Sequence, residues 1–240
     1  MRTTIYGFPM IVFQKYADGT YEFIGRYNFN LDKGANNVIG FEYEIKHPIL
    51  TNRDLPEVAE CWEFKNNQGT RCSFKTVNFA EYKTNTDGTV GPLTVLDDFE
   101  YRYSYYEDAI DDAIDGKNDF ASKTQEERNA YLLERMANLE EVCNWLMSTH
   151  TDLATGNALE NSVIYNNIEY THDTVDYRLA KFRNEFDLHF DREYCEVYFI
   201  CTELLLQYDS RGKNMMLATW GPKVEGGNYI WYPIFYDIDT

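Results

Sequence analysis

The hydrophobic pattern of the chain changes its period near residue 97, and this change constrains the fold more than any other sequence feature. Before that point, apolar residues form short runs that are rich in β-branched and aromatic side chains and are separated by turn-forming pairs such as Asp-Gly. Such runs are typical of strands. After that point, and as far as about residue 208, apolar residues recur every three or four positions, which is typical of amphipathic helices. The order predicts an α+β fold with a strand-rich first part and a helical second part.

The clearest strand signal is a hairpin near the start of the chain. Residues 9–16 and 21–29 are apolar runs that flank an Asp-Gly turn, which is a strong hairpin signal. The second run carries four aromatic residues of one parity: Tyr21, Phe23, Tyr27 and Phe29. One face of this hairpin is therefore expected to be aromatic, although Ile24 and Gly25 interrupt the pattern.

Further strands are expected on both sides of the helical part. Residues 60–65 and 70–77 predict a second hairpin, because the segment between them is rich in Asn and Gly, which tolerate positive φ. Residues 84–96 hold an Asp-Gly and a Gly-Pro pair and are expected to form a loop. Residues 215–220 and 229–236 predict a closing hairpin.

Three helices are expected in the second part. The first begins with a capping box at residues 124–127 and ends near residue 147. The second and third begin at the N-cap residues Thr174 and Asp191, and residues 151–170 are expected to form a loop. The side chains expected to face the core are Leu132, Met136, Leu139, Cys143 and Leu146 in the first helix, Val175, Leu179, Phe182 and Phe186 in the second, and Tyr194, Val197, Tyr198, Cys201, Leu204 and Leu205 in the third.

The charge of the chain excludes two classes of partner. It carries 22 Lys and Arg against 40 Asp and Glu, which gives a net charge of -18. Nucleic-acid binding needs clustered cations, and an anionic membrane surface repels such a chain. The sequence has no apolar run of about 18 residues, and Pro9 breaks the short apolar stretch at the start. We therefore expect neither nucleic acid nor membrane as a partner.

One constellation near the end of the sequence points to catalytic chemistry. Asp209 and Asn214 follow the third predicted helix, and Asp237 and Asp239 follow the closing hairpin. This order of helix, Asp-x4-Asn loop, hairpin and carboxylate is the layout of a protein-kinase catalytic centre. There the loop Asp orients the attacking hydroxyl, and the Asn and the last Asp hold Mg²⁺ against nucleotide phosphates. Oxygen ligands of this kind suit Mg²⁺.

A kinase site also needs a cation on the strand-rich part to neutralise the phosphates. Lys75 is the best candidate, because it lies on a predicted strand. Its acidic partner would be Glu134, Glu140 or Glu141 of the first helix, and the sequence does not choose among them. No G-x-G-x-x-G loop is present in the sequence, which excludes a typical eukaryotic kinase.

Structural roles for the same residues stay open. Asp209 and Asn214 also favour the turn that ends a helix. Asp237 and Asp239 fit a solvated strand end, and Lys75 fits an exposed strand position.

Four segments spread along the chain resemble the CotH kinase family of spore-coat proteins. They are residues 23–33 (FIGRYNFNLDK), residues 73–75 (SFK), the Asp209-x4-Asn214 loop and residues 231–239 (WYPIFYDID). These are similar to the family's aromatic G-x-Y strand, its strand ending in Tyr-Lys, and its late W-x-P-x-x-x-D-x-D hairpin.

The resemblance implies an atypical, kinase-like fold of two lobes, with a β-rich N-lobe-like part over residues 1–96 and a helical C-lobe-like part over residues 97–240. It implies Mg²⁺ and ATP as cofactors. Carried over by position, the site would comprise Lys75 on the phosphates, Asp209 as the catalytic carboxylate, Asn214 and Asp237 on the metal, and Asp239 in support of the metal site.

A narrower resemblance points to bacteriophages. Residues 60–64, 177–186 and 209–215 are similar to virion proteins of short-tailed phages, including the tail-tip "muzzle" proteins of crAss-like gut phages, which contain a CotH-like region. This implies a structural protein of the virion, in the tail or tail tip, made in the cytoplasm of the bacterial host. Its partners would be other virion proteins or copies of itself. Twenty tyrosines agree with a role in protein contacts.

Two alternatives to a virion component are considered. The main one is an active CotH-like atypical protein kinase that transfers phosphate from Mg-ATP to protein hydroxyls. The sequence does not decide between this enzyme and a structural protein with a kinase-like fold. The weaker one is a secreted carbohydrate-binding or adhesion module. Because a kinase fold needs helices beyond Thr240, we expect the sequence to be a fragment that is truncated at its C-terminus.

Overall fold

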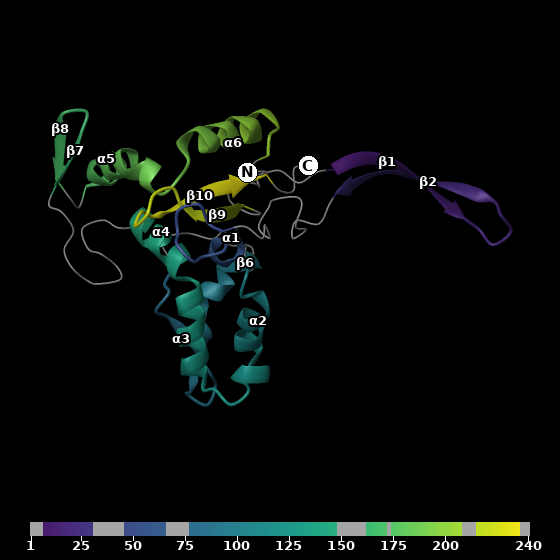
Figure 1. The fold of residues 1–240 in the computed structure, drawn as a ribbon, viewed down its shortest axis with the longest axis horizontal. Helices are drawn as coiled ribbons and strands as arrows, with labels where there is room; N and C mark the ends of the chain where they lie inside the picture. Colours follow the sequence, from purple (N-terminus) through teal and green to yellow (C-terminus); the bar gives the residue numbers. More distant parts are fainter. Residues whose placement is uncertain are drawn as a thin grey trace.

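The computed structural model describes residues 7–30, 46–65, 77–147, 162–171, 174–207 and 215–235. Helices and several small sheets both contribute to it, which confirms the α+β class (Figure 1). Most elements form one body. Strands β1 (Gly7–Lys15) and β2 (Tyr21–Asn30) form an antiparallel hairpin, the arm, that extends away from the body. The arm confirms the first predicted hairpin.

A four-stranded antiparallel sheet forms the centre of the body, in the order β10–β9–β3–β6. Its strands are β3 (Glu60–Phe64), β6 (Phe99–Ser104), β9 (Met216–Pro222) and β10 (Tyr229–Ile234). The hairpin β9–β10 confirms the predicted closing hairpin. One strand of the sheet comes from residues 1–96 and three come from residues 97–240, so both predicted parts of the chain contribute to one sheet.

Both faces of this sheet are buried. Successive strand residues point to opposite faces, so the neighbours Cys61 and Trp62 of β3 enter two different hydrophobic cores. The larger core, around Trp62, lies against helices α2 (Glu107–Asp115), α3 (Gln125–Arg135) and α4 (Ala137–Met147). The smaller core, around Cys61, includes Leu55 and Val58 of the short helix α1 (Leu55–Val58).

Helices α3 and α4 replace the single helix predicted from residue 124 to residue 147. The capping box forms as predicted, with Thr124 and Glu127 each accepting a backbone N–H of the other. The helix breaks at Met136, whose N–H donates to two carbonyls of the preceding turn. The break leaves the predicted apolar stripe buried at Leu132, Met136, Leu139 and Cys143.

The predicted pairing of residues 60–65 with residues 70–77 is wrong. Strand β3 pairs with β6 along one edge and with β9 along the other. A strand has only two edges for hydrogen bonding, so none remains for a hairpin partner. The pattern of apolar residues predicts β3 itself correctly, but pairing depends on strands that lie far away in the sequence. Residues 66–76 lie outside the described residues.

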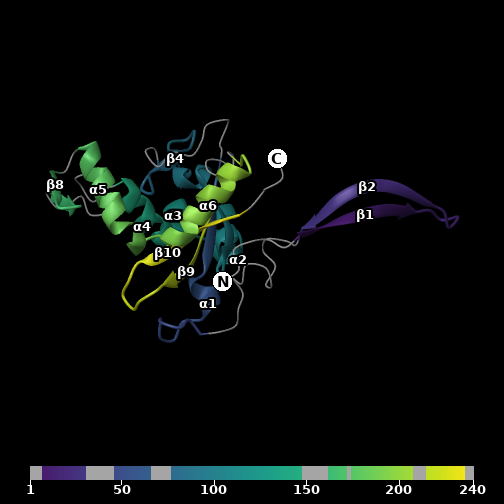
Figure 2. The same ribbon diagram turned by 90° about the horizontal axis from the view of Figure 1, so that it is seen from above.

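Two predicted loops contain hairpins instead. Strands β4 (Tyr82–Thr84) and β5 (Val90–Leu93) pair around a turn at Asp87 and Gly88, where Gly88 has a φ of 84°, and η2 (Thr94–Asp97) follows them. An Asp-Gly turn favours a hairpin as much as a loop. Strands β7 (Ser162–Tyr165) and β8 (Ile168–Thr171) form a hairpin around two residues of positive φ, at the end of the molecule away from the arm (Figure 2).

Two further helices begin where the sequence predicts. Thr174 caps α5 (Val175–Glu185) and Asp191 caps α6 (Arg192–Leu204), since each side chain accepts a backbone N–H three residues later. The short helix η4 (Phe186–Leu188) lies between them. Helix α6 packs along strand β10.

The predicted inward faces of these two helices are wrong in most positions. In α5, the buried residues are Tyr177 and Ala180, whereas the prediction put Val175, Leu179 and Phe182 inward. In α6, Tyr198 is buried as predicted, but three predicted core residues are exposed: Val197 by 48%, Leu204 by 77% and Leu205 by 55%. An apolar periodicity shows which face will avoid water, but it does not show whether the same chain covers that face.

Among the residues that the structure describes, no helix combines the length and the apolar character that crossing a membrane requires.

The packing around α4 yields a stability prediction. Leu139 has an exposed fraction of 0% and belongs to the larger core. Leu139→Ala removes buried methyl groups and leaves a cavity, which costs about 2–5 kcal/mol of unfolding free energy. Urea denaturation followed by circular dichroism measures this loss. The matched control is Leu188→Ala, because Leu188 is 56% exposed and the same substitution there is expected to change stability by less than about 0.5 kcal/mol. Equal losses in both variants would contradict the packing.

Candidate functional site

The residues predicted to form a kinase site all lie outside the described parts of the chain. They are Lys75, Asp209, Asn214, Asp237 and Asp239. Their roles on phosphate and Mg²⁺ therefore stay predictions. Of the three acidic candidates to pair with Lys75, Glu134 forms an ion pair with Arg135. Within the described ranges, no group of three or more His, Cys, Asp and Glu side chains is placed to hold a metal ion.

Glu60 is a carboxyl group buried in the centre of the sheet, where it is 6% exposed. One of its oxygens accepts a hydrogen bond from Trp62 Nε1 at 2.8 Å, and the other accepts one from Asn138 Nδ2 of α4 at 2.9 Å. Burial raises the pKa of Glu60 to about 7, because these two bonds offset only part of the lost solvation. A carboxyl group with this pKa can exchange a proton near neutral pH.

The neighbours of Glu60 indicate that its carboxyl group has a structural role. Burial raises the pKa of Tyr229 on β10, and the charge of Glu60 raises it further. Each oxygen of Glu60 accepts a hydrogen bond from a core neighbour, so the group ties α4 to the sheet.

His189 is a second buried titratable group. Its ring stacks on Trp145 with centroids 4.2 Å apart, and Asn228 Nδ2 lies 3.3 Å from its Nε2. Burial lowers the pKa of His189 to about 4, so the ring is neutral at physiological pH. Trp145 in turn donates from Nε1 to Glu185 at 2.8 Å. These contacts join α4, α5 and the β9–β10 turn. Like Glu60, His189 therefore has a structural role.

The arm has the chemistry of an interaction surface. One of its faces, called the arm face below, carries Ile11, Phe13, Lys15, Tyr21, Phe23 and Arg26. Cross-strand pairing puts them together: Phe13 lies opposite Phe23 with ring centroids 5.6 Å apart, and Lys15 Nζ lies 5.6 Å from the centre of the Tyr21 ring.

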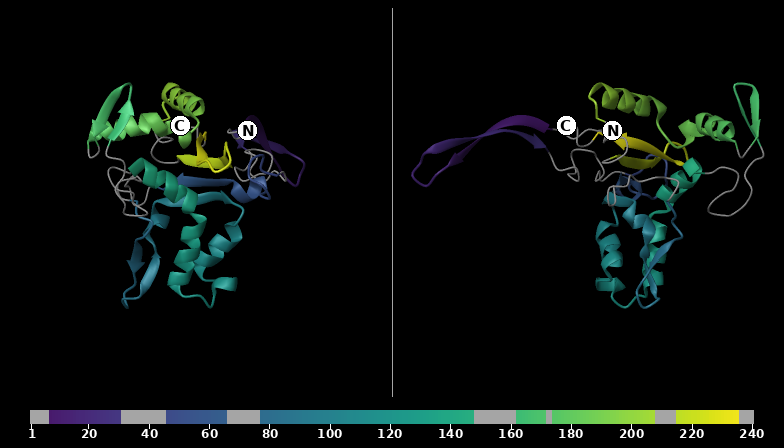
Figure 3. Two further views of the ribbon diagram at one scale, coloured as in Figure 1. Left: turned by 60° about the vertical axis from the view of Figure 1, so that its left-hand side comes forward. Right: turned by 180° about the vertical axis from the view of Figure 1, so that it is seen from behind.

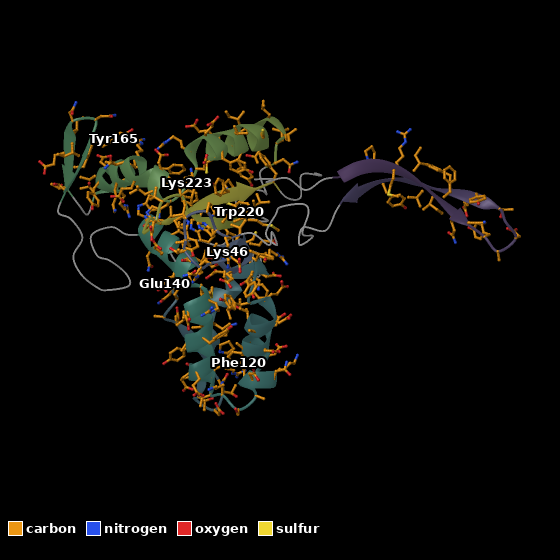
Figure 4. All side chains as sticks on the ribbon, viewed as in Figure 1. Lys46, Phe120, Glu140, Tyr165, Trp220 and Lys223 are labelled. Atoms are coloured by element: carbon orange, nitrogen blue, oxygen red, sulfur yellow. The ribbon has the colours of Figure 1, made fainter. Side chains whose placement is uncertain are left out.

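The apolar side chains of the arm face are open to solvent. Ile11, Phe13, Tyr21 and Phe23 are between 56% and 65% exposed. Figure 4 shows the arm side chains standing clear of those of the body, and the right-hand view of Figure 3 shows the arm ribbon extending away from the body from behind. A two-stranded hairpin without a packed face is marginally stable in water. The arm face therefore has the properties of a surface that another molecule covers.

A bulge in β2 decides which residues share the arm face. The register shifts between Val12 and Phe13, and Gly25 in the bulge has a φ of 154°. Beyond the bulge, Tyr27 pairs with Met10 on the opposite face, so the predicted single aromatic face is split in two. The Tyr27 ring covers Gly25, since a Cβ added there would lie 3.3 Å from Tyr27 Cε2. The interruption of the sequence pattern at Gly25 was the signal for this bulge.

Helix α6 presents a second exposed surface, on the side turned away from β10. It is called the α6 stripe below and consists of Glu193, Glu196, Val197, Ile200 and Leu204. Their spacing of three and four residues puts them on one face of the helix. Val197, Ile200 and Leu204 are between 48% and 77% exposed. Sequence reasoning missed this surface, because it assigned Val197 and Leu204 to the core.

Comparisons with known proteins add no family to this description. No protein-family model matches the chain, and no similar curated protein or solved structure was found.

Glu60 yields a prediction about pH. Its pKa is about 7 in the folded chain against an ordinary 4.5, so the folded chain keeps a proton that the unfolded chain loses between these values. Its contribution to stability is therefore complete below about pH 4.5 and is lost as the pH rises to about 7. Relative to Glu60→Gln, which does not titrate, the wild-type chain should lose up to about 3 kcal/mol of unfolding free energy across this range.

Urea denaturation of both proteins at a series of pH values measures this difference. Glu126→Gln, at an exposed position of α3, is the control and should follow the wild-type curve. A difference between wild type and Glu60→Gln that stays constant with pH would contradict the prediction.

Proposed function

We propose that this chain is a structural subunit of a protein assembly and, as its sequence resemblance suggests, a component of a bacteriophage tail or tail tip. The single observation that carries the proposal is the arm face. It exposes four large apolar side chains on a two-stranded hairpin that extends from the body. In an assembled particle these side chains would be buried against a neighbouring subunit, which would supply the stabilisation that a lone hairpin lacks.

The body supports the same proposal. The α6 stripe exposes aliphatic side chains next to acids, and Ile164 and Ile168 of the β7–β8 hairpin are 65% and 54% exposed. A chain with several separate apolar surfaces fits a subunit with several neighbours. The net charge of -18 argues that these neighbours are proteins, rather than nucleic acid or an anionic membrane.

The kinase alternative rests on the sequence alone. Its five residues lie outside the described parts of the chain. Among the described residues, the buried His and Glu side chains, His47, Glu60, Glu63 and His189, are all engaged by neighbours within the protein. No observation on the described residues favours it over the assembly proposal.

The proposal predicts where the chain is found in the cells that produce it. Particles are separated from a lysate by density-gradient sedimentation, and the chain is quantified in each fraction by mass spectrometry. Wild-type chain should co-sediment with the particles. Phe13→Ser combined with Phe23→Ser removes two apolar contacts of the arm face and should lower incorporation by at least about tenfold, since each buried aromatic contributes more than about 1.4 kcal/mol.

Gln14→Ser is the matched control, because Gln14 lies on the opposite face of the same strand. It should be incorporated like wild type. Wild-type chain recovered only as free protein, with none in the particle fractions, would overturn the proposed function.

A further inference from the structure

We propose that the arm face of one copy of this chain binds along the α6 stripe of a second copy. This inference rests on the proposed function and names the partner for the arm. The two surfaces are different parts of the chain, so each copy would offer its arm to one neighbour and receive an arm from another. Such a heterologous contact builds a ring or a filament.

The arm face is both apolar and basic. Lys15 and Arg26 lie on it together with the exposed apolar side chains. The two acids of the arm are placed elsewhere: Glu22 accepts a hydrogen bond from Tyr16 on the opposite face, and Asp18 accepts two from Thr20 in the turn. The arm as a whole is neutral, with two cations and two acids, but the arm face carries only the cations.

The α6 stripe is apolar and acidic, and so complements the arm face. Glu193 and Glu196 lie at its start, and Val197, Ile200 and Leu204 follow. The nearest cation on the helix, Arg192, does not neutralise them, because its guanidinium is bound to Asp187 at 2.9 and 3.1 Å.

The two surfaces also match in length. Along the arm face, Ile11 and Lys15 are four strand residues apart, or about 13 Å. Along the α6 stripe, Glu193 and Leu204 are eleven helical residues apart, or about 16 Å. A strand ribbon of this length can therefore lie along the helix with its aromatic side chains over Val197 and Ile200, while a cation at one end reaches the acids.

A second copy is favoured as the partner by the distribution of charge. The arm contributes no net charge, so the whole excess of acids lies in the rest of the chain. Two such chains repel each other over most of their surface, and the arm face is where a copy can approach an acidic body with opposite charge. The arm of one copy does not reach the α6 stripe of the same copy in this structure, because the arm extends away from the body in both views (Figures 1 and 2).

Charge reversal in two complementary variants tests the contact. One variant carries Lys15→Glu and Arg26→Glu, and the other carries Glu193→Lys and Glu196→Lys. Association of each purified protein is followed by analytical ultracentrifugation over a concentration series, at about 0.1 M salt, where charges separated by less than about 10 Å still interact. Wild type should associate, and each variant alone should show an apparent dissociation constant raised by at least about tenfold, because like charges then face each other.

The decisive sample is an equimolar mixture of the two variants. In it, each acidic arm meets a basic stripe and each basic arm meets an acidic stripe, so association should return to near the wild-type level. All four substitutions in one chain should restore it as well. Glu22→Lys, on the opposite face of the arm, and Glu225→Lys, in the exposed β9–β10 turn, are the matched controls and should associate like wild type. Unchanged thermal unfolding of every variant shows that the body remains folded.

Three results would overturn the inference. They are wild-type association by both charge-reversed variants, failure of their mixture to associate, and a wild-type chain that stays monomeric at the highest concentration reached. None of these results decides the proposed function, which stands or falls on the sedimentation experiment: a chain found in particles but monomeric alone would have a different protein as the partner of its arm.

Discussion

The structure depends on the complete enclosure of strand β3. Its backbone is paired on both edges, by β6 and by β9, and its side chains enter a separate core on each face. Five consecutive residues of β3 are buried. Helix α4 is tied to this strand through Glu60, whose carboxyl group remains in the core only with its two hydrogen bonds and a raised pKa. The strands that enclose β3 lie in the middle and near the end of the described chain, so the body forms only once these distant segments meet.

This long-range pairing separates what the sequence predicts from what it does not. Local signals worked: the capping side chains of Thr124, Thr174 and Asp191 start three helices, and the first and last hairpins form as expected. Such features depend on a few neighbouring residues. Pairing of β3 with β6 and β9 depends on segments that no local pattern connects, and the predicted hairpin between residues 60–65 and 70–77 was wrong for that reason.

The incorrect burial predictions have a common physical cause. Val197 and Leu204 follow a helical period that places them on one face, and this periodicity does not distinguish a core face from an interface. Covering either face removes the same apolar area from water, so selection for folding and selection for assembly leave similar patterns. Apolar residues that follow the periodicity of a core face, yet are exposed to solvent, therefore indicate a surface that binds another protein. The predicted kinase residues give no such information, since they lie outside the described ranges.

Strong acidity and exposed apolar surface fit together in a subunit that must assemble in only one way. An aromatic hairpin on a neutral body would attach to any apolar surface, including the other copies of the same hairpin. On an acidic body, contacts between copies carry an electrostatic cost everywhere except where a cation of the arm face, Lys15 or Arg26, meets carboxylates. The apolar side chains then supply affinity, and the charges select the orientation in which that affinity is realised. Removing the acidity would not abolish association, but it would remove the difference in free energy between the correct contact and the others.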